Sequence, residues 1–191
     1  MIFQWKENKM KKYDTIFLDR DGTLNPDPGY INSLDKYAFF DFTIPALNEM
    51  SKYCNGFCII TNQSGLSREI IQIDELSKIH NFILNEFYQN KLNLLGIYFC
   101  PDHPDKPTIN RKPGIGMFQA AAKDHNINLK NSIMIGDALS DIEAGLNLNM
   151  DTMLVLTGRG KKSKENLKGF NPNFIADNLM DGAKTLYRHF R

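Results

Sequence analysis

Short apolar runs alternate with longer amphipathic segments along most of the 191-residue chain. Apolar residues that recur every three or four positions predict helices, and short apolar runs bounded by turn residues predict buried strands. Strands that alternate with helices are typical of βαβ units, whose right-handed crossovers build a mostly parallel sheet. The sequence therefore predicts an α/β fold with a doubly wound, mostly parallel sheet.

The predicted strands cover residues 13–18, 57–60, 96–99, 132–135 and 152–156, with a further short strand at 174–175. Helices are predicted over 44–53, 74–88, 116–125, about ten residues from Leu139, and 180–190, with Asp74 as the N-cap of the second. Ligands of such sheets bind beyond the carboxyl ends of the strands, so the residues that follow each strand are the candidates for chemistry.

The domain organisation is expected to be simple. Residues 1–12 are predicted to be an N-terminal extension and residues 13–191 a single domain. The two connections that could hold an inserted cap domain, 24–42 and 100–114, are too short for one. We therefore expect an open site framed by three loops, at 25–33, 64–70 and 100–113.

The composition of the chain argues against some classes of binding partner. Hydrophobic residues make up 42% of the chain, and the formal net charge is +1, which gives no electrostatic case for nucleic acid or a membrane surface. The three cysteines are too few for a disulfide framework and fit a reducing compartment. The N-terminal segment has no apolar run of a secretory signal. We expect a cytoplasmic monomer that acts on a small molecule.

The segment Asp19-Arg20-Asp21-Gly22-Thr23 follows the first predicted strand directly. A carboxylate such as Asp19 can attack phosphorus, and Asp21 can give a proton to the leaving oxygen and then take one from water. Mg²⁺ prefers oxygen ligands and can join Asp19 to a phosphate. A solvated turn is the alternative, but an apolar strand running into DxDGT favours phosphoryl transfer.

Three further segments add polar groups after later strands. Thr61-Asn62-Gln63-Ser64-Gly65 offers a hydroxyl and N–H groups for phosphate oxygens, with a polar loop as the alternative. In 111–113, Lys112 can neutralise a phosphoryl group and Arg111 can hold a second anion, unless both form a surface pair. Asp137 is a candidate third magnesium ligand or a helix N-cap, and Asp141 a residue that orients metal-bound water or a helix-dipole partner.

The segments DRDGT, TNQSG, RKP and GDALSD closely resemble the motifs of the haloacid dehalogenase superfamily of aspartate-based phosphatases, and the resemblance covers nearly the whole chain from Tyr13. FLDRDGTLN, PDPGYI, ITNQSGLSR, GIYFCPDHP and RKPGIGM are similar to a small branch that acts on a heptose bisphosphate or on histidinol phosphate. The resemblance implies a Rossmann-like fold and release of the 7-phosphate of D-glycero-D-manno-heptose 1,7-bisphosphate, for lipopolysaccharide or surface-layer heptose. Histidinol phosphate, or small phosphates in general, are the alternative substrates.

The resemblance also implies roles for individual residues. Asp19 would be the nucleophile and a magnesium ligand, Asp21 the acid/base and a second ligand, and Asp137 a third ligand. Thr61 and Lys112 would stabilise the phosphoryl group. The implied substrate site consists of Asp27, Pro28, Gly29, Tyr30, Thr61, Asn62, Gln63, Ser64, Arg111, Lys112 and Ala138.

One loop departs from the family pattern. Relatives carry a structural zinc bound by Cys-x-His and a later Cys-x-Cys, whereas this chain keeps Cys100 but has Asp102, Thr108 and Asn110 at the other ligand positions. A closed zinc site needs four good ligands, so we expect no zinc. Cys54 and Cys58 are expected to be core residues.

Two other classes of protein share parts of this pattern. A signalling receiver domain is also a doubly wound sheet with a phosphorylated aspartate, but an acid/base two residues after that aspartate argues against a stable phosphorylated switch. A non-catalytic relative is not supported, because all four chemical positions are filled. Fold alone does not decide among these classes.

Overall fold

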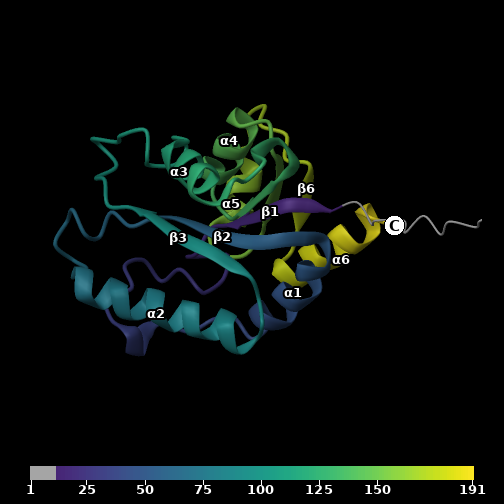
Figure 1. The fold of residues 1–191 in the computed structure, drawn as a ribbon. Coiled ribbons are helices and arrows are strands. Elements are labelled where there is room, and N and C mark those ends of the chain that lie inside the picture. Colours follow the sequence, from purple (N-terminus) through teal and green to yellow (C-terminus); the bar gives the residue numbers. More distant parts are fainter. Residues whose placement is uncertain (1–11) are drawn as a thin grey trace, which may run out of the picture.

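The computed structural model describes residues 12–191 and contains a six-stranded sheet in the order β3-β2-β1-β4-β5-β6. Every neighbouring pair is parallel, which confirms the predicted α/β fold (Figure 1). The strands are β1 (Tyr13–Leu18), β2 (Cys54–Asn62), β3 (Leu94–Cys100), β4 (Ile133–Gly136), β5 (Asp151–Val155) and β6 (Phe174–Ala176).

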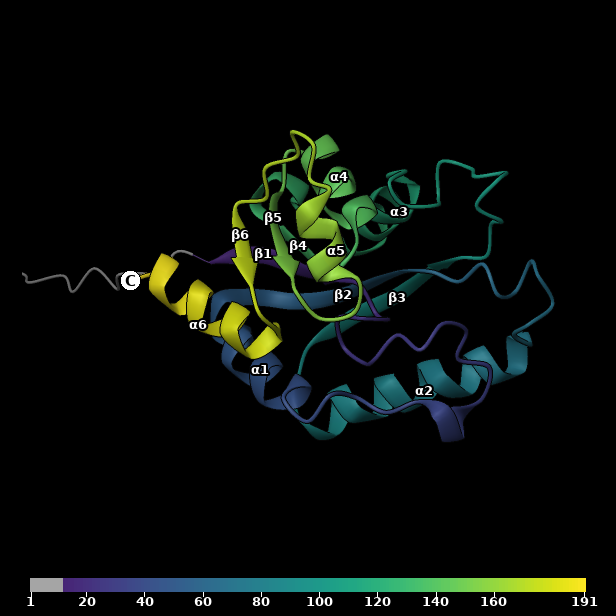
Figure 2. The same cartoon turned by 180° about the vertical axis from the view of Figure 1, so that it is seen from behind.

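Helices cover both faces of this sheet (Figures 1 and 2). α1, α2 and α6 pack on one face and contribute to one apolar core, while α3 and α4 pack on the other face around a second core. The helices are α1 (Thr43–Met50), α2 (Ile73–Gln89), α3 (Gly116–His125), α4 (Leu139–Asn147), α5 (Gly160–Glu165) and α6 (Leu179–His189).

The central strand β1 shows why the sequence reads as a continuous apolar run. Ile16 and Leu18 belong to the first core, and Phe17 between them belongs to the second, where its ring contacts Phe118 of α3. All three strand side chains are fully buried. A parallel strand covered on both faces is rich in apolar residues, and Asp19 directly follows the carboxyl end of this strand.

The predicted strands and helices are present, with shifted ends. β2 runs from Cys54 to Asn62, well beyond the predicted 57–60, and Cys54 and Cys58 are buried as expected. Asp74 is not the N-cap of α2, because the helix begins at Ile73 and Gln72 precedes it without a side-chain cap bond. α5 was not predicted, since its sequence GKKSKE has no apolar periodicity.

The connections flanking the site are short, as predicted. Between β1 and α1 lies one 3-10 turn, Leu34–Lys36, and residues 101–115 between β3 and α3 form no regular element. Most of the predicted N-terminal extension, residues 1–11, lies outside the described residues. Within residues 12–191, no helix has the length and apolarity needed to cross a bilayer.

We expect Ile59→Ala to lower the free energy of unfolding by about 2–5 kcal/mol, because it leaves a cavity in a fully buried part of β2. Ile73→Ala is the matched control: Ile73 is 53% exposed at the start of α2, so its loss should change stability by less than about 0.5 kcal/mol. Urea unfolding measures both. Equal losses would contradict the two-sided burial of the central strands.

Candidate active site

A pocket opens at the carboxyl ends of the strands, where side chains that follow β1, β2, β4 and β5 meet the segment before α3. All three loops predicted to frame the site contribute to its wall. The lining residues are Asp19, Asp21, Asp27, Gly29, Tyr30, Ile31, Thr61, Asn62, Gln63, Ser64, Gly65, Ile71, Pro104, Arg111, Lys112, Asp137, Ala138, Ser140, Asp141 and Arg159.

The ammonium group of Lys112 is buried at the floor of this pocket, with only 2% of the side chain exposed. It lies 2.7 Å from Asp19 Oδ1, 2.7 Å from Asp141 Oδ1 and 2.7 Å from the carbonyl oxygen of Ile60. Burial would lower the pKa of Lys112, but the Asp141 and Asp19 carboxylates outweigh it and hold the pKa above its usual value. Lys112 is therefore a fixed cation beside Asp19.

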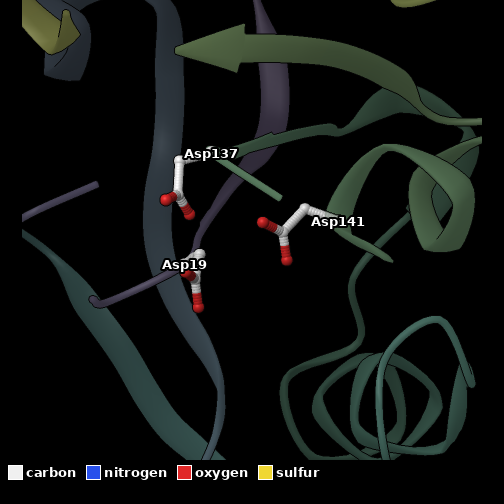
Figure 3. A group of neighbouring side chains, drawn as sticks. All are labelled: Asp19, Asp137 and Asp141. Atoms are coloured by element: carbon white, nitrogen blue, oxygen red, sulfur yellow. The ribbon is translucent and has the colours of Figure 1, made fainter. Parts of the chain in front are cut away.

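Asp19, Asp137 and Asp141 form a buried group whose ligand atoms lie within 4.8 Å of one another (Figure 3). Burial raises the pKa of Asp19 to about 7, with a smaller contribution from repulsion by Asp141 and Asp21, although the Lys112 charge opposes the shift. Burial and repulsion from Asp19 and Asp141 raise the pKa of Asp137 to about 8. Crowded carboxylates with too little positive charge are a donor set that suits a hard divalent cation.

The chain approaches Asp137 closely through glycines. Gly22, at φ +85°, and Gly158, at φ +51°, have left-handed backbones, and a Cβ atom on either would run into the Asp137 carboxylate. The backbone N–H of Arg159 donates to Asp137 Oδ2 at 2.7 Å. Only glycine leaves this space free, so the turns after β1 and β5 are shaped around Asp137.

The side chain of Asp21 has a different environment and is not part of this carboxylate group. Arg20, which is fully buried, donates from Nε and Nη2 to its two oxygens at 3.1 and 2.8 Å. Asn25 and Gln63 donate to the same carboxylate at 3.0 and 2.8 Å. Burial alone would raise the pKa of Asp21, but the Arg20 charge and these hydrogen bonds hold it below its usual value.

The last residues of β2 support the site from one side. The Thr61 hydroxyl accepts from Gln63 Nε2 at 2.8 Å. The Asn62 amide makes two hydrogen bonds with the backbone of Lys112, at 3.1 Å each, which fixes the segment that carries the lysine. Asn62 therefore has a positioning contact that its sequence context did not indicate.

Most sequence-predicted site residues line the pocket, but Pro28 is not among them. Arg159 lines it and was not singled out from the sequence. The sequence did contain a signal for it, because Thr157-Gly158-Arg159 comes two residues after the end of the apolar strand β5. Ser140, in the first turn of α4, also lines the pocket and was likewise missed. The rule that ligands lie beyond strand ends applies to every strand, including those without an acidic motif.

The loop at 100–113 keeps its shape through hydrogen bonds at the positions where zinc ligands were considered. Asp102 Oδ2 accepts the Thr108 N–H at 2.7 Å, and Thr108 Oγ1 accepts the Asn110 N–H at 3.2 Å. Cys100 is a buried free thiol. Arg111 Nη1 donates to the Asp102 carbonyl at 3.0 Å, so the same loop holds Arg111 at the pocket.

Comparison with known proteins gives consistent matches. The family model described as HAD-hydrolase-like matches residues 109–182. A D-glycero-beta-D-manno-heptose-1,7-bisphosphate 7-phosphatase of Haemophilus influenzae is 34% identical, covering 91% of this chain and 96% of that protein. The enzyme of the same name in Escherichia coli K12 is 34% identical, covering 87% of this chain and 92% of that protein.

Among solved structures, D,D-heptose 1,7-bisphosphate phosphatase from B. bronchiseptica, complexed with magnesium and phosphate, has a TM-score of 0.82 at 28% identity. The match covers 92% of this chain and 99% of that one. The chain therefore belongs to the haloacid dehalogenase superfamily of hydrolases and is a phosphatase, as the motifs indicated. Within it, the relatives at 34% identity carry the name of a heptose bisphosphate 7-phosphatase.

The crowded carboxylates make the stability of metal-free protein depend on pH. The folded pKa values of Asp19 and Asp137, about 7 and about 8, exceed the ordinary value of 3.8. Between about pH 4 and pH 8 the folded state retains protons that the unfolded state has lost, so stability falls as pH rises. In chelator, Asp137→Asn should thus unfold at a higher temperature than wild type at pH 8, with little difference at pH 5.

A divalent cation should reverse that order at pH 8, because wild type keeps the ligand that the variant lacks. Asp41→Asn, which changes an exposed carboxyl group on the turn before α1, should match wild type under every condition. A wild type as stable as Asp137→Asn at pH 8 in chelator would contradict the repulsion within the carboxylate group.

Proposed function

We propose that this chain is a Mg²⁺-dependent phosphatase that removes the 7-phosphate of D-glycero-D-manno-heptose 1,7-bisphosphate through an aspartyl-phosphate on Asp19. The observation that carries the proposal is the placement of Asp19 beside buried Lys112, in a pocket shared with Asp137 and Asp141. The relatives at 34% identity are named for this substrate. As part of the proposal, residues 13–191 form one cytoplasmic, monomeric domain without structural zinc.

In the proposed first step, a carboxylate oxygen of Asp19 attacks phosphorus and the ester P–O bond breaks. Asp21 gives its proton to the leaving alkoxide oxygen. Asp21 is held ionised by Arg20 before substrate arrives. The negative charge of an entering phosphate opposes that ionisation, so protonation of Asp21 accompanies binding.

In the proposed second step, Asp21 takes a proton from water, and the resulting hydroxide attacks the aspartyl-phosphate. Phosphate leaves, and the carboxylate of Asp19 is restored. Lys112 neutralises charge on the phosphoryl oxygens in both steps, and the Thr61 hydroxyl offers a further donor. Bound Mg²⁺, held by the carboxylates of Asp19 and Asp137, would add positive charge beside the phosphoryl group.

The substrate part of the proposal rests on the rim of the pocket. The ammonium group of Lys112 is already paired with Asp19 and Asp141 at the floor of the pocket. Arg111, the preceding residue, also lines the pocket and donates a hydrogen bond to the Asp102 carbonyl. A guanidinium group suits bidentate binding of phosphate. A substrate with a second phosphate can use this group, whereas histidinol phosphate offers an amine there.

Asp19→Asn should abolish phosphate release, because an amide keeps the shape of the side chain but lacks the attacking oxyanion. Phosphate release measured with Mg²⁺ tests this, and the variant should keep its cooperative thermal unfolding. Asp41→Asn is the control and should retain full activity. Turnover by Asp19→Asn above a few per cent of wild type would overturn the covalent mechanism.

Arg111→Ala should lower kcat/KM for the heptose 1,7-bisphosphate by roughly ten- to a hundredfold, the scale of a lost charge-assisted contact. Heptose 7-phosphate has the same scissile ester but no second phosphate, so its kcat/KM should change far less. Lys112→Ala should instead impair both substrates. Equal losses for both substrates in Arg111→Ala would leave a general small-molecule phosphatase, and preference of the wild type for histidinol phosphate would replace the substrate.

A further inference from the structure

Arg159 lies in the turn between β5 and α5 and lines the active-site pocket, while 69% of its side chain is exposed. Its backbone N–H is bonded to Asp137 Oδ2. That contact uses a main-chain group, so it does not depend on the side chain. The guanidinium group extends from this anchored position and takes no part in the contact with Asp137.

Asp27, in the loop after β1, holds the guanidinium group. Nε and Nη2 of Arg159 each lie 3.2 Å from Asp27 Oδ2. The other oxygen, Oδ1, accepts the Gly29 N–H at 3.0 Å. The Asp27 side chain is only 10% exposed and both of its oxygens have protein donors, so it is placed to orient Arg159 more than to contact a ligand.

The ion pair leaves part of Arg159 available. A guanidinium group has five N–H donors, and among residues 12–191 Asp27 is the one side chain that bonds to it. Its Nη1 donors have no protein acceptor within that range. An ion pair with an exposed partner adds little to stability, so the arrangement has more to offer to an anion in the pocket than to the fold.

We propose that Arg159 is a specificity-determining residue that binds the phosphate that is not transferred, with Asp27 as its positioning residue. The inference deepens the proposed function and rests on it. Arg111 follows β3 and Arg159 follows β5, and these strands lie on opposite sides of β1 in the sheet. A bisphosphate with one phosphate at Asp19 would therefore have a guanidinium group on either side of its second phosphate.

The experiment compares heptose 1,7-bisphosphate with heptose 7-phosphate, using the full chain with Mg²⁺. Arg159→Gln should lower kcat/KM for the bisphosphate by roughly tenfold or more, mainly through KM, and by less than about threefold for the 7-phosphate. Arg159→Lys should show a smaller loss of kcat/KM than Arg159→Gln, because lysine keeps the positive charge but cannot bind phosphate with two parallel N–H donors. Lys161→Gln removes the same charge from an exposed position on α5 and should leave both substrates unaffected.

Asp27→Asn tests the positioning role. It should weaken the bisphosphate preference in wild type and have no further effect in the Arg159→Gln background, because it acts through the arginine. Equal losses for both substrates in Arg159→Gln would assign the pair to loop structure and overturn the inference. An additive Asp27→Asn effect would overturn the positioning role.

The failure of the proposed function looks different. A wild type that hydrolyses neither heptose phosphate, or shows no preference for the bisphosphate, removes the basis of both proposals. A wild type that prefers the bisphosphate, loses that preference in Arg111→Ala and keeps it in Arg159→Gln would overturn only the role of Arg159.

Discussion

The buried ammonium group of Lys112 is the interaction on which the site depends. It joins Asp19 at the end of β1, the Ile60 carbonyl on β2 and Asp141 at the start of α4. Removal of one partner from a buried ion pair typically costs about 3–5 kcal/mol, because the remaining charge stays buried without compensation. Lys112 thus joins four segments of the chain and places a positive charge in direct contact with Asp19.

Around Lys112, buried carboxylates outnumber buried cations. Lys112 forms ion pairs with Asp19 and Asp141, whereas Asp137 has no ion-pair partner among residues 12–191. Arg20, the other buried cation nearby, is paired with Asp21. Two acids with pKa values near neutrality show that this region accepts further positive charge. A divalent cation bound by these carboxylates would supply that positive charge. The phosphate group of a substrate is negatively charged and would then be attracted to the cation. The pocket is therefore arranged for a metal ion and a phosphate together.

The sequence predicted the fold, and it predicted which acids and which lysine lie together at the floor of the pocket. Both follow from patterns that are local. Apolar runs that end in DRDGT or in GDALSD give a strand, its carboxyl end and an acid in one segment. The contact of Arg20 with Asp21 and the contact of Asp141 with Lys112 were not predicted. Such contacts depend on side-chain directions set by packing, which periodicity does not encode. The polar helix α5 was missed for a related reason, since its position is imposed by β5 and not by an apolar stripe.

The rim of the pocket is built differently from its floor. At the floor, the buried charged groups interact with one another, so a substitution there changes the stability of the protein as well as its chemistry. At the rim, Arg111 and Arg159 are held by single partners in loops, the Asp102 carbonyl and the Asp27 carboxylate. Loops tolerate change better than buried elements. If the proposed roles of Arg111 and Arg159 hold, changes confined to these loop contacts would alter the choice of substrate while leaving the floor of the pocket unchanged.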